Sequence, residues 1–519
     1  MSLIQDYQAS FRERNAYLSQ EFTSGPVDWT DAPYKHTVRP GVFEVPLPNG
    51  RLLAGHLADT GARPGLTLAA LAQVLWYTNG LLRRKVDVDW ARSAAAQNRD
   101  GPSYARGTSS GGGLYPTELY LVAEDLPGLP NGIYHHCEAR STLQRTLAGR
   151  HARALCASWR GVMRHGVCHL VLTTRFWKNV FKYKNFGYQL MTEDCGAVVG
   201  TLLQALDDVG IAATVRFNFA DRGVAGIMGL DLEAEAAMIV IELGDGPVRL
   251  DPPRVAAPAP AAVRPPAPLE RSRRVAVPAL IGELHRATML DAVGIPTPLP
   301  AWDRAYASAV WDALPPAAPI AGTTRLFMQR RSSMGRQLGE DPLTRQELAT
   351  LLAAANAPYR CDLDAAAAPP RAVRLAAYAR HVDALAPGAY AYCADRHALV
   401  QSAGPDTSGI DVQRIYYMQN YNINQTGVLL AVVARHGAAH AAWGDRSIRI
   451  CNGEAGMAAQ RIYLAAAQLG LSCGAVLGFN CAEADALFGL DRPAESIVLM
   501  MLIARRPVLQ AAFDSRFDG

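Results

Sequence analysis

The chain has 519 residues, of which half are hydrophobic and 19% are charged, and its formal net charge is +4. This length exceeds one ordinary hydrophobic core and predicts at least two domains. Because 51 basic residues are nearly balanced by 47 acidic ones, the chain lacks the positive excess that nucleic acid binding needs, and we expect no nucleic acid partner.

The sequence also argues against export and membrane insertion. Residues 1–15 contain no apolar signal-peptide core, and apolar runs such as 497–504 are far shorter than the ~20 residues that span a bilayer. The nine cysteines include no CxxC pair and their number is odd, which favours reduced thiols. No HExxH motif or Cys/His cluster predicts a metal site. We therefore expect a cytoplasmic protein without a membrane partner or a metal.

The predicted elements, in chain order, mix helices and strands. Helices are expected where apolar residues recur at helical spacing, over 67–77, 192–209, 344–355 and 455–469. Thr67 and Thr344 suit N-caps, and Gly210 and Gly470 suit C-terminal caps. Strands are expected over the β-rich runs 118–123, 237–243 and 496–504, and His135-His136 is assigned to a turn with a structural role. The sum is an α+β fold.

A stretch rich in Pro, Ala, Val and Arg divides the chain. Residues 251–278 favour extended, semi-rigid backbone and predict an interdomain linker. The basic run Arg271–Arg274 is interpreted as part of that solvated linker rather than as a docking motif. The predicted domains are therefore 1–250 and 279–519.

The two halves repeat the same landmarks in the same order. Matching segments are Leu66–Leu71 with Leu343–Leu348, Asn131–Tyr134 with Pro387–Tyr390, and Gly229–Asp231 with Gly489–Asp491. The offset falls from 277 at Leu66 to 256 at Gly132, so the second copy has lost 21 residues between these landmarks, among them Ser109–Gly113. This pattern predicts a duplicated fold in which each copy supplies a different part of one site.

The lost stretch is the strongest candidate for a binding loop. Ser109–Gly113 is small and glycine-rich, so backbone N–H groups and two hydroxyls can approach a ligand closely. It is neither a Walker loop nor a dinucleotide fingerprint. The pattern G-x-S-x-G occurs at 107–111 and 470–474, but neither place has the strand-turn-helix context of a hydrolase nucleophile.

Two further segments carry candidate binding groups. In the second copy, Arg330-Arg331-Ser332, Arg336 and Arg505-Arg506 predict a phosphate site, since guanidinium forks match phosphate oxygens; the first copy has Leu243-Gly244 where Arg505-Arg506 stand. The stretch 176–188 interleaves aromatic residues with lysines. It suits either a surface that holds a flavin or a peptide, or a helix on the core with snorkelling lysines.

These motifs resemble the nitroreductase-like flavoproteins, specifically the SagB-type (McbC-like) azoline dehydrogenases. Arg330-Arg331-Ser332 resembles the family's phosphate motif, and Lys182-Tyr183 resembles its catalytic pair. Arg106 with Ser109–Pro116 resembles a third family segment, although Ser109 replaces the usual proline and Met334 replaces a frequent basic residue. The resemblance covers nearly the whole chain, because each half looks like one subunit.

The resemblance implies an intramolecular pseudo-dimer of tandem nitroreductase-like domains with one working FMN site and one decayed site. The implied cofactor-binding residues are Arg106, Ser109, Ser110, Gly111, Gly112, Arg330, Arg331, Ser332, Arg336, Gly474, Arg505 and Arg506. The implied reaction is oxidation of a thiazoline or oxazoline ring in a peptide, with hydride passing to FMN and dioxygen reoxidising the flavin. Lys182 or Tyr183 is the implied base, with Tyr183 favoured as a phenolate stabilised by Lys182. An azoline-containing peptide and a cyclodehydratase are the implied partners, and residues 1–65 are candidates for that contact.

Three alternatives stay open at this point. The chain could be an NAD(P)H-dependent reductase of nitroaromatics or quinones, or an oxidase of a carrier-bound thiazoline. It could also be a non-catalytic scaffold of a peptide-modifying complex, in which both sites have decayed.

Overall fold

The chain forms two compact units, each of which is made of more than one segment. The computed structural model describes residues 2–12, 27–48, 65–85, 103–159, 168–244, 265–294, 296–302, 306, 309–319, 333, 338–363, 371–402, 411–418, 420–490, 494–506 and 514–516. Unit 1 comprises Met1–Gly25, Pro298–Pro358 and Pro370–Ala512. Unit 2 comprises Pro26–Thr297, Tyr359–Pro369 and Phe513–Gly519.

These units differ from the predicted division at the N-terminus and after the linker. Helix α1 (Leu3–Arg12) belongs to unit 1, and helix α9 (Ala279–Ala287) belongs to unit 2. Residues 251–264 of the predicted linker lie outside the described part of the chain. The remainder packs on unit 2: the Trp177 indole donates to the buried Ser272 hydroxyl at 2.8 Å, and the Leu269 amide donates to the Val38 carbonyl at 2.9 Å.

Unit 2 is built on a broad, almost wholly antiparallel sheet. Its strand order is β1-β6-β5-β4-β7-β9-β8-β11, and β11 alone pairs in parallel, with β8. The strands are β1 (Glu44–Pro46), β4 (Thr117–Ala123), β5 (Gly132–Cys137), β6 (Thr142–Ala148), β7 (Cys168–Arg175), β8 (Ala213–Arg216), β9 (Glu235–Leu243) and β11 (Arg360–Cys361). A separate small sheet has the order β18-β2-β3, with β2 (Leu81–Lys85), β3 (Ser103–Arg106) and β18 (Asp514–Arg516).

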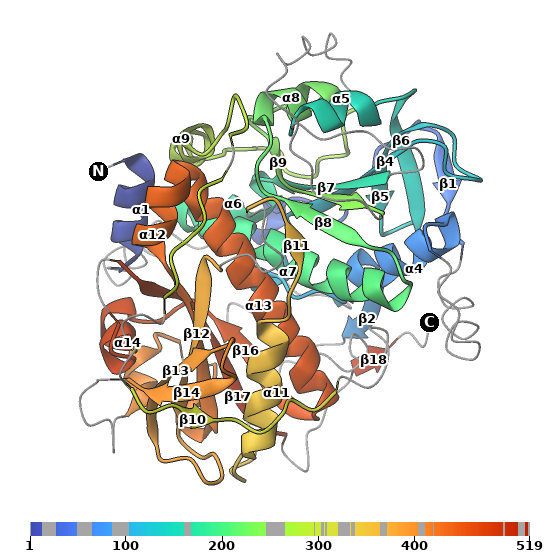
Figure 1. Ribbon diagram of the computed structural model, residues 1–519. Helices are drawn as coiled ribbons and strands as arrows, with labels where there is room; N and C mark the ends of the chain where they lie inside the picture. The colour runs from blue at the N-terminus through green and yellow to red at the C-terminus, as the bar shows by residue number, and fades with distance from the viewer. Residues whose placement is uncertain are drawn as a thin grey trace. The chain divides into compact units, whose positions relative to one another are not determined.

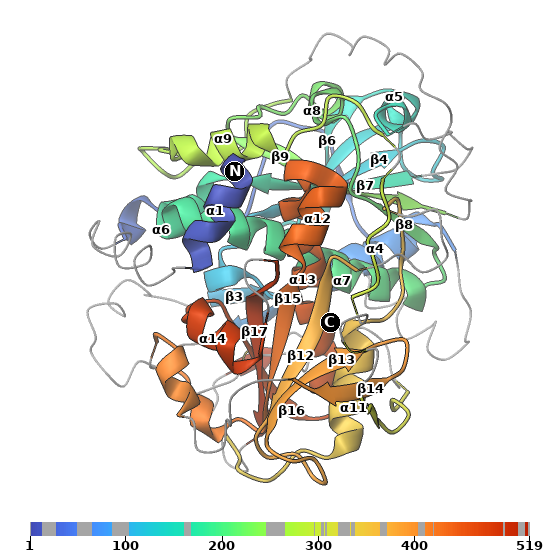
Figure 2. The ribbon, with the colours of Figure 1, turned by 60° about the vertical axis from the view of Figure 1, so that its left-hand side comes forward.

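Helices cover the large sheet of unit 2. The long helix α7 (Gly187–Asp208) packs on β4, β7 and β9, and α4 (Leu68–Asn79) packs on α7 (Figure 1). Helix α6 (Trp177–Tyr183) and the 3-10 turn η3 (Lys184–Phe186) lead into α7. Helices α5 (Ala152–Ala157) and α8 (Asp221–Met228) lie together (Figure 2) and close a second core around Trp159.

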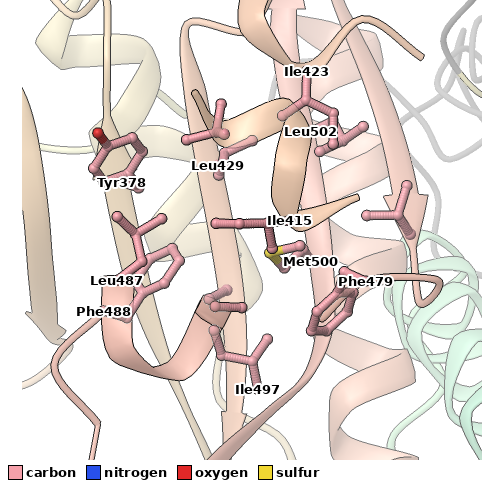
Figure 3. Packing of buried hydrophobic residues seen from close by; sticks show 14 of the residues in the cluster. Tyr378, Ile415, Ile423, Leu429, Phe479, Leu487, Phe488, Ile497, Met500 and Leu502 are labelled. Atoms are coloured by element: carbon pink, nitrogen blue, oxygen red, sulfur yellow. The ribbon is translucent and has the colours of Figure 1, made fainter. Parts of the chain in front are cut away.

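Unit 1 repeats this architecture. Its sheet order is β10-β14-β13-β12-β15-β17-β16, antiparallel throughout. The strands are β10 (Asp312–Ala313), β12 (Val373–Ala379), β13 (Gly388–Cys393), β14 (Ala398–Gln401), β15 (Val428–Ala434), β16 (Leu471–Val476) and β17 (Ser496–Arg505). Helix α13 (Ser447–Gln468) packs on β12, β15, β16 and β17, with α11 (Arg345–Ala355) and α12 (His436–Trp443) beside it. A core of apolar side chains joins the sheet to α14 (Cys481–Leu487) and to the 3-10 turns η5 (Val412–Ile415) and η6 (Ile423–Gln425); Figure 3 shows Phe479, Phe488 and Met500 within it.

The sheets of the two units share their strand order. Strands β6, β5, β4, β7, β9 and β8 of unit 2 correspond in order to β14, β13, β12, β15, β17 and β16 of unit 1. Helices α7 and α13 are both 22 residues long, and each follows a short helix and a 3-10 turn. The α+β prediction is confirmed, and the shared strand order agrees with the duplicated fold inferred from the sequence landmarks.

A segment of the second copy completes the sheet of unit 2. Residues 359–363 lie between two segments of unit 1 in the sequence but belong to unit 2, where strand β11 pairs with β8. Directly after β11, the buried carboxylate of Asp362 accepts hydrogen bonds from the backbone amides of Phe217 at 2.9 Å and Asn218 at 3.0 Å. These bonds satisfy two amides at the end of β8 that would otherwise be buried without partners.

Most predicted elements are confirmed, with two corrections. Thr67 and Thr344 are N-caps, and Thr344 forms a capping box with Glu347. Gly210 and Gly470 adopt left-handed conformations after their helices. Helices α7 and α13 begin several residues before the predicted starts, because each follows a 3-10 turn directly and has no capping side chain. The assignment of His135-His136 to a turn is wrong: both lie in the fully buried strand β5.

Candidate functional site

The predicted glycine loop and the predicted catalytic pair meet within unit 2. Gly111–Gly113 forms the 3-10 turn η2 just before β4, and Lys182-Tyr183 ends helix α6. A Cβ atom on Gly112 would lie 2.5 Å from the Tyr183 hydroxyl and 2.9 Å from Lys182 Nζ. Gly112 also has φ +62°, so both its conformation and its surroundings require glycine. The loop backbone therefore lies directly against the two functional groups.

A buried carboxylate that the sequence analysis did not single out holds this loop. Asp194 of α7 accepts a hydrogen bond from the Ser110 hydroxyl at 2.5 Å and one from the Gly111 amide at 2.9 Å. The Ser110 oxygen in turn accepts from the Tyr115 amide at 2.9 Å. Asp194 is only 7% exposed, and burial raises the pKa of its carboxyl to about 7 despite the hydrogen bonds and the nearby Arg106, which lower it.

The electrostatics of Tyr183 disfavour the predicted phenolate. Burial raises the pKa of the Tyr183 phenol well above its usual value, and the Asp194 carboxyl raises it further. Lys182 Nζ lies 4.5 Å from the centre of the Tyr183 ring and 5.7 Å from that of Trp29, so the ammonium faces aromatic rings. Tyr183 therefore keeps its proton at neutral pH and is suited to donating a hydrogen bond rather than to acting as a phenolate base.

Arg106 has a structural environment that the sequence could not show. Its buried guanidinium donates to Glu138 Oε1 at 2.5 Å, to Asn79 Oδ1 at 2.5 Å and to the Lys35 carbonyl at 2.9 Å. It also stacks over the Tyr115 ring at 4.8 Å from the ring centre. Although burial would raise it, Arg106 and His36 bring the pKa of the Glu138 carboxyl down to about 2. Arg106 thus anchors β3 to the end of β5, next to the glycine loop.

A second buried ion pair lies on helix α6 itself. Lys178 is 4% exposed, and its ammonium donates to Glu118 of β4 and to the Lys35 carbonyl. Glu118 also accepts from Thr37 at 2.6 Å and pairs with His135 at 2.8 Å. Burial would raise the pKa of the Glu118 carboxyl, but Lys178 and His135 hold it well below its usual range. The interpretation of the lysines here as snorkelling is wrong for Lys178, which fixes α6 to the sheet.

The equivalent positions in unit 1 carry different chemistry. Helix α6 ends in Lys182-Tyr183, whereas α12 ends in Ala442-Trp443. Asp194 and Glu454 are both the eighth residue of their 22-residue helices. Glu454, however, accepts from the amides of Ala372 and Val373 at the start of β12. At these two positions unit 1 therefore carries Ala442-Trp443 in place of the lysine-tyrosine pair, and an acidic residue that binds the start of β12.

The predicted phosphate ligands are described only in part. Arg330, Arg331, Ser332 and Arg336 lie outside the described residues. Arg505 ends β17, and its guanidinium pairs with both oxygens of Glu347 at 2.5 and 2.9 Å and donates to the Pro342 carbonyl. Arg506 Nε donates to the Leu471 carbonyl at 3.3 Å, and Gly474 lies buried within β16. Arg505 therefore already has a carboxylate partner, and its role as a phosphate ligand stays a prediction.

The loop fits the flat, polar ring system that the resemblance implies. A Cβ on Gly113 would meet no atom within 4 Å, so this glycine borders open space, and its φ of +64° favours glycine. Trp29, Trp177 and Tyr183 pack around Phe181 and Leu114 and give the neighbourhood an aromatic wall. A cradle of small residues beside aromatic rings and a lysine suits a flavin.

The sequence and the fold are similar to those of known nitroreductases. Residues 327–505 match the nitroreductase family. It is similar to the microcin B17-processing protein McbC of Escherichia coli, with 30% identity over 159 residues, which are 29% of this chain and 58% of McbC. The crystal structure of a protein from Anabaena variabilis, assigned as a nitroreductase, matches 96% of this chain and 99% of its own with a TM-score of 0.74 and 18% identity, which shows the shared fold.

Two further observations concern the described part of the chain. None of its helices is both long enough and apolar enough to cross a bilayer. All nine cysteines fall within it, and each is buried as a free thiol.

Proposed function

We propose that the chain is an FMN-dependent oxidoreductase that oxidises thiazoline or oxazoline rings in a peptide. The observation that carries this proposal is the packing of Gly112 against Lys182 Nζ and the Tyr183 hydroxyl. The similarity to McbC, which processes microcin B17, supports a peptide substrate. When bound, FMN would supply the acceptor for two electrons.

The residues of unit 2 suit distinct parts of this reaction. Gly111–Gly113 lets a planar ring approach the backbone. Asp194 of helix α7 holds this loop through its hydrogen bond with the Gly111 amide. Because burial keeps Tyr183 protonated, we assign it as a hydrogen-bond donor and Lys182 as the group that accepts the ring proton. Arg106 and Lys178 hold the supporting strands and helix through buried ion pairs.

We propose further that one FMN binds per chain. Ala442-Trp443 of unit 1 can neither accept a proton nor carry a charge, so the equivalent position there is not equipped for the same chemistry. We propose, from the resemblance, that the phosphate of this FMN is bound by residues of the second copy: Arg330, Arg331, Ser332, Arg336, Arg505 and Arg506. A measured ratio of two FMN per chain would contradict this part of the proposal.

The proposed partners are an azoline-containing peptide and the cyclodehydratase that must supply it. Oxidation of an azoline requires a preceding enzyme that closes the ring from a cysteine or serine side chain. Reconstitution of the chain with a candidate cyclodehydratase and a peptide would test this assignment.

An absorption spectrum followed by mass spectrometry tests the activity. We expect a yellow protein that removes two hydrogens per azoline ring in the presence of dioxygen. Rapid bleaching of the flavin by NAD(P)H, without peptide oxidation, would instead assign a reductase of nitro or quinone compounds. Oxidation of a carrier-bound thiazoline but not of a peptide would change the substrate class. A colourless protein that does not take up FMN would leave a scaffold role.

A further inference from the structure

Asp194 is a buried carboxyl group of helix α7 that lies next to the proposed site. Its two oxygens bind two successive residues of the loop, Ser110 and Gly111, from helix α7. Gly112, the next residue, lies against Lys182 and Tyr183. The Asp194 carboxylate therefore fixes the loop backbone that contacts the proposed base and the proposed hydrogen-bond donor.

The second copy is a natural comparison for this contact. Glu454 occupies the same turn of α13, yet it binds the first amides of β12. Both copies thus carry an acidic residue at this position. In unit 2 this residue binds the glycine loop, a segment that the sequence of the second copy lacks. The contact of Asp194 is specific to the copy that holds Lys182-Tyr183.

We propose that Asp194 is a positioning residue whose carboxylate holds Ser110–Gly112 beneath Lys182 and Tyr183, and that uptake of a proton by Asp194 releases this segment. The inference rests on the proposed function of the same site. A protonated carboxyl group loses one acceptor oxygen, so it can no longer accept from both Ser110 and Gly111 in the same way. The loop then loses a hydrogen bond to a charged group, which is stronger than a neutral one. The release is local: Asp194 stays buried on α7 and loses only the two hydrogen bonds that lower its pKa, so protonation favours the released state.

The groups around Asp194 make this transition accessible near neutral pH. Arg106 on β3 favours the charged form, whereas burial disfavours it and brings the carboxyl pKa to about 7. Tyr183 on α6 faces Asp194 and has its own pKa raised by it, and Lys182 lies on the same helix beside Gly112. The Ser110 hydroxyl and the Gly111 amide complete the surroundings on the loop.

Hydrogen exchange of the full chain without FMN tests the inference directly. The readout is protection of the Gly111 amide, corrected for its intrinsic exchange rate, between pH 5 and pH 9. In the unsubstituted protein we expect protection to rise on the order of tenfold as the pH passes through about 7, because the bond to a charged acceptor forms. In Asp194→Asn we expect weak protection that does not change with pH.

Two further variants keep the test decisive. Ser110→Ala removes one donor to the carboxylate without altering helix α7, and we expect it to shift the transition to higher pH, because a hydrogen bond that lowers the Asp194 pKa is lost. Glu454→Gln changes the equivalent carboxylate in unit 1 and should leave Gly111 protection unchanged. Equal protection at all pH values in the unsubstituted protein, or the same pH profile in Asp194→Asn, would overturn the inference.

The same proteins separate this inference from the proposed function. If FMN binds and azoline rings are oxidised, yet exchange at Gly111 is independent of Asp194, the proposed function stands and the positioning role fails. If no FMN is taken up but the exchange transition is present, the positioning role stands and the proposed function fails. Flavin fluorescence supplies a second readout: the unsubstituted protein loaded with FMN should release more flavin below about pH 7, whereas the flavin affinity of Asp194→Asn should be low and should not change with pH.

Discussion

Lys182 and Ala442 occupy the same position in the two copies, one residue before the end of the short helix that leads to the long helix of each unit. The two copies therefore share the backbone conformation at this position but differ in the side chain. A methyl group can neither accept nor donate a proton, so chemistry at this position belongs to unit 2.

Substitution of the pair should separate chemistry from cofactor binding. We expect Lys182→Ala and Tyr183→Phe each to lower azoline oxidation by 10²-fold or more, the usual worth of positioned proton transfer, while FMN stays bound. Mass loss per ring and the flavin absorption spectrum measure the two effects. Trp443→Phe in unit 1 is the matched control and should retain full activity. Full activity in both unit 2 variants would refute the assignment.

Two neighbouring glycines of the loop allow the cost of backbone strain to be measured separately from the cost of a side-chain clash. Gly113→Ala meets open space, so it should lower the free energy of unfolding only by the strain of a left-handed residue, about 1–2 kcal/mol. Gly112→Ala carries the same strain and also displaces Lys182 and Tyr183, which adds about 1–3 kcal/mol. Chemical denaturation measures both losses. Equal losses for the two variants would show that Gly112 does not contact the pair.

Lys184 stores backbone strain beside the pair. Its φ of 45° and ψ of −130° are unfavourable for any residue with a side chain, and the equivalent residue of unit 1 is Gly444 with φ 58° and ψ −146°. Both Lys184→Gly and Lys184→Ala remove the hydrogen bond from Lys184 Nζ to the Phe181 carbonyl. We expect the glycine variant to be more stable than the alanine variant by about 1 kcal/mol in denaturation experiments. A more stable alanine variant would contradict the strained conformation.

The buried pair of Lys178 and Glu118 should be costly to break from either side. We expect Lys178→Met and Glu118→Gln each to lower the free energy of unfolding by about 3–5 kcal/mol, because each leaves a buried group without its partner. The double variant should lose less than the sum of the two. Arg222→Met, which removes the exposed pair with Asp291, is the control and should cost less than about 1 kcal/mol. Additive losses would show that the two charges do not interact.

Two buried histidines should make unit 2 sensitive to acid. Burial lowers the pKa of His136 and of His169 to about 4, below the usual 6.5. Since the unfolded chain then binds more protons, each contributes stability that is present above about pH 6.5 and is lost towards about pH 4, at up to about 1.4 kcal/mol per pH unit.

Comparison of variants isolates this effect, because Asp194 titrates in the opposite sense. Its raised pKa gives stability that is present below about pH 4 and is lost as the pH rises to about 7. Unfolding curves of the unsubstituted protein and of His169→Gln between pH 4 and pH 7 should therefore converge as the pH falls. Parallel curves over this range would mean that His169 takes up no proton on unfolding.

Local sequence was sufficient for the elements and for the repeat. Helical periodicity and N-cap threonines identified α4 and α11, and β-rich runs identified β4, β9 and β17. The resemblance to nitroreductase-like flavoproteins implied that Ser109–Gly113 and Lys182-Tyr183 serve one site. The role of Asp194 was not predictable, because a lone acidic residue inside an apolar helix gives no sign of which loop it will meet.

The sequence by itself determined the α+β class, the duplication and the asymmetry between the copies, since these follow from local pattern and from residues that one copy has lost. Only the tertiary structure decided which charges are buried and with whom. Arg106, predicted as a cofactor ligand, pairs with Glu138, and Arg505 pairs with Glu347. Burial and partner choice depend on contacts between residues far apart in the chain, and those contacts raise the pKa of both Asp194 and Tyr183 beside the glycine loop.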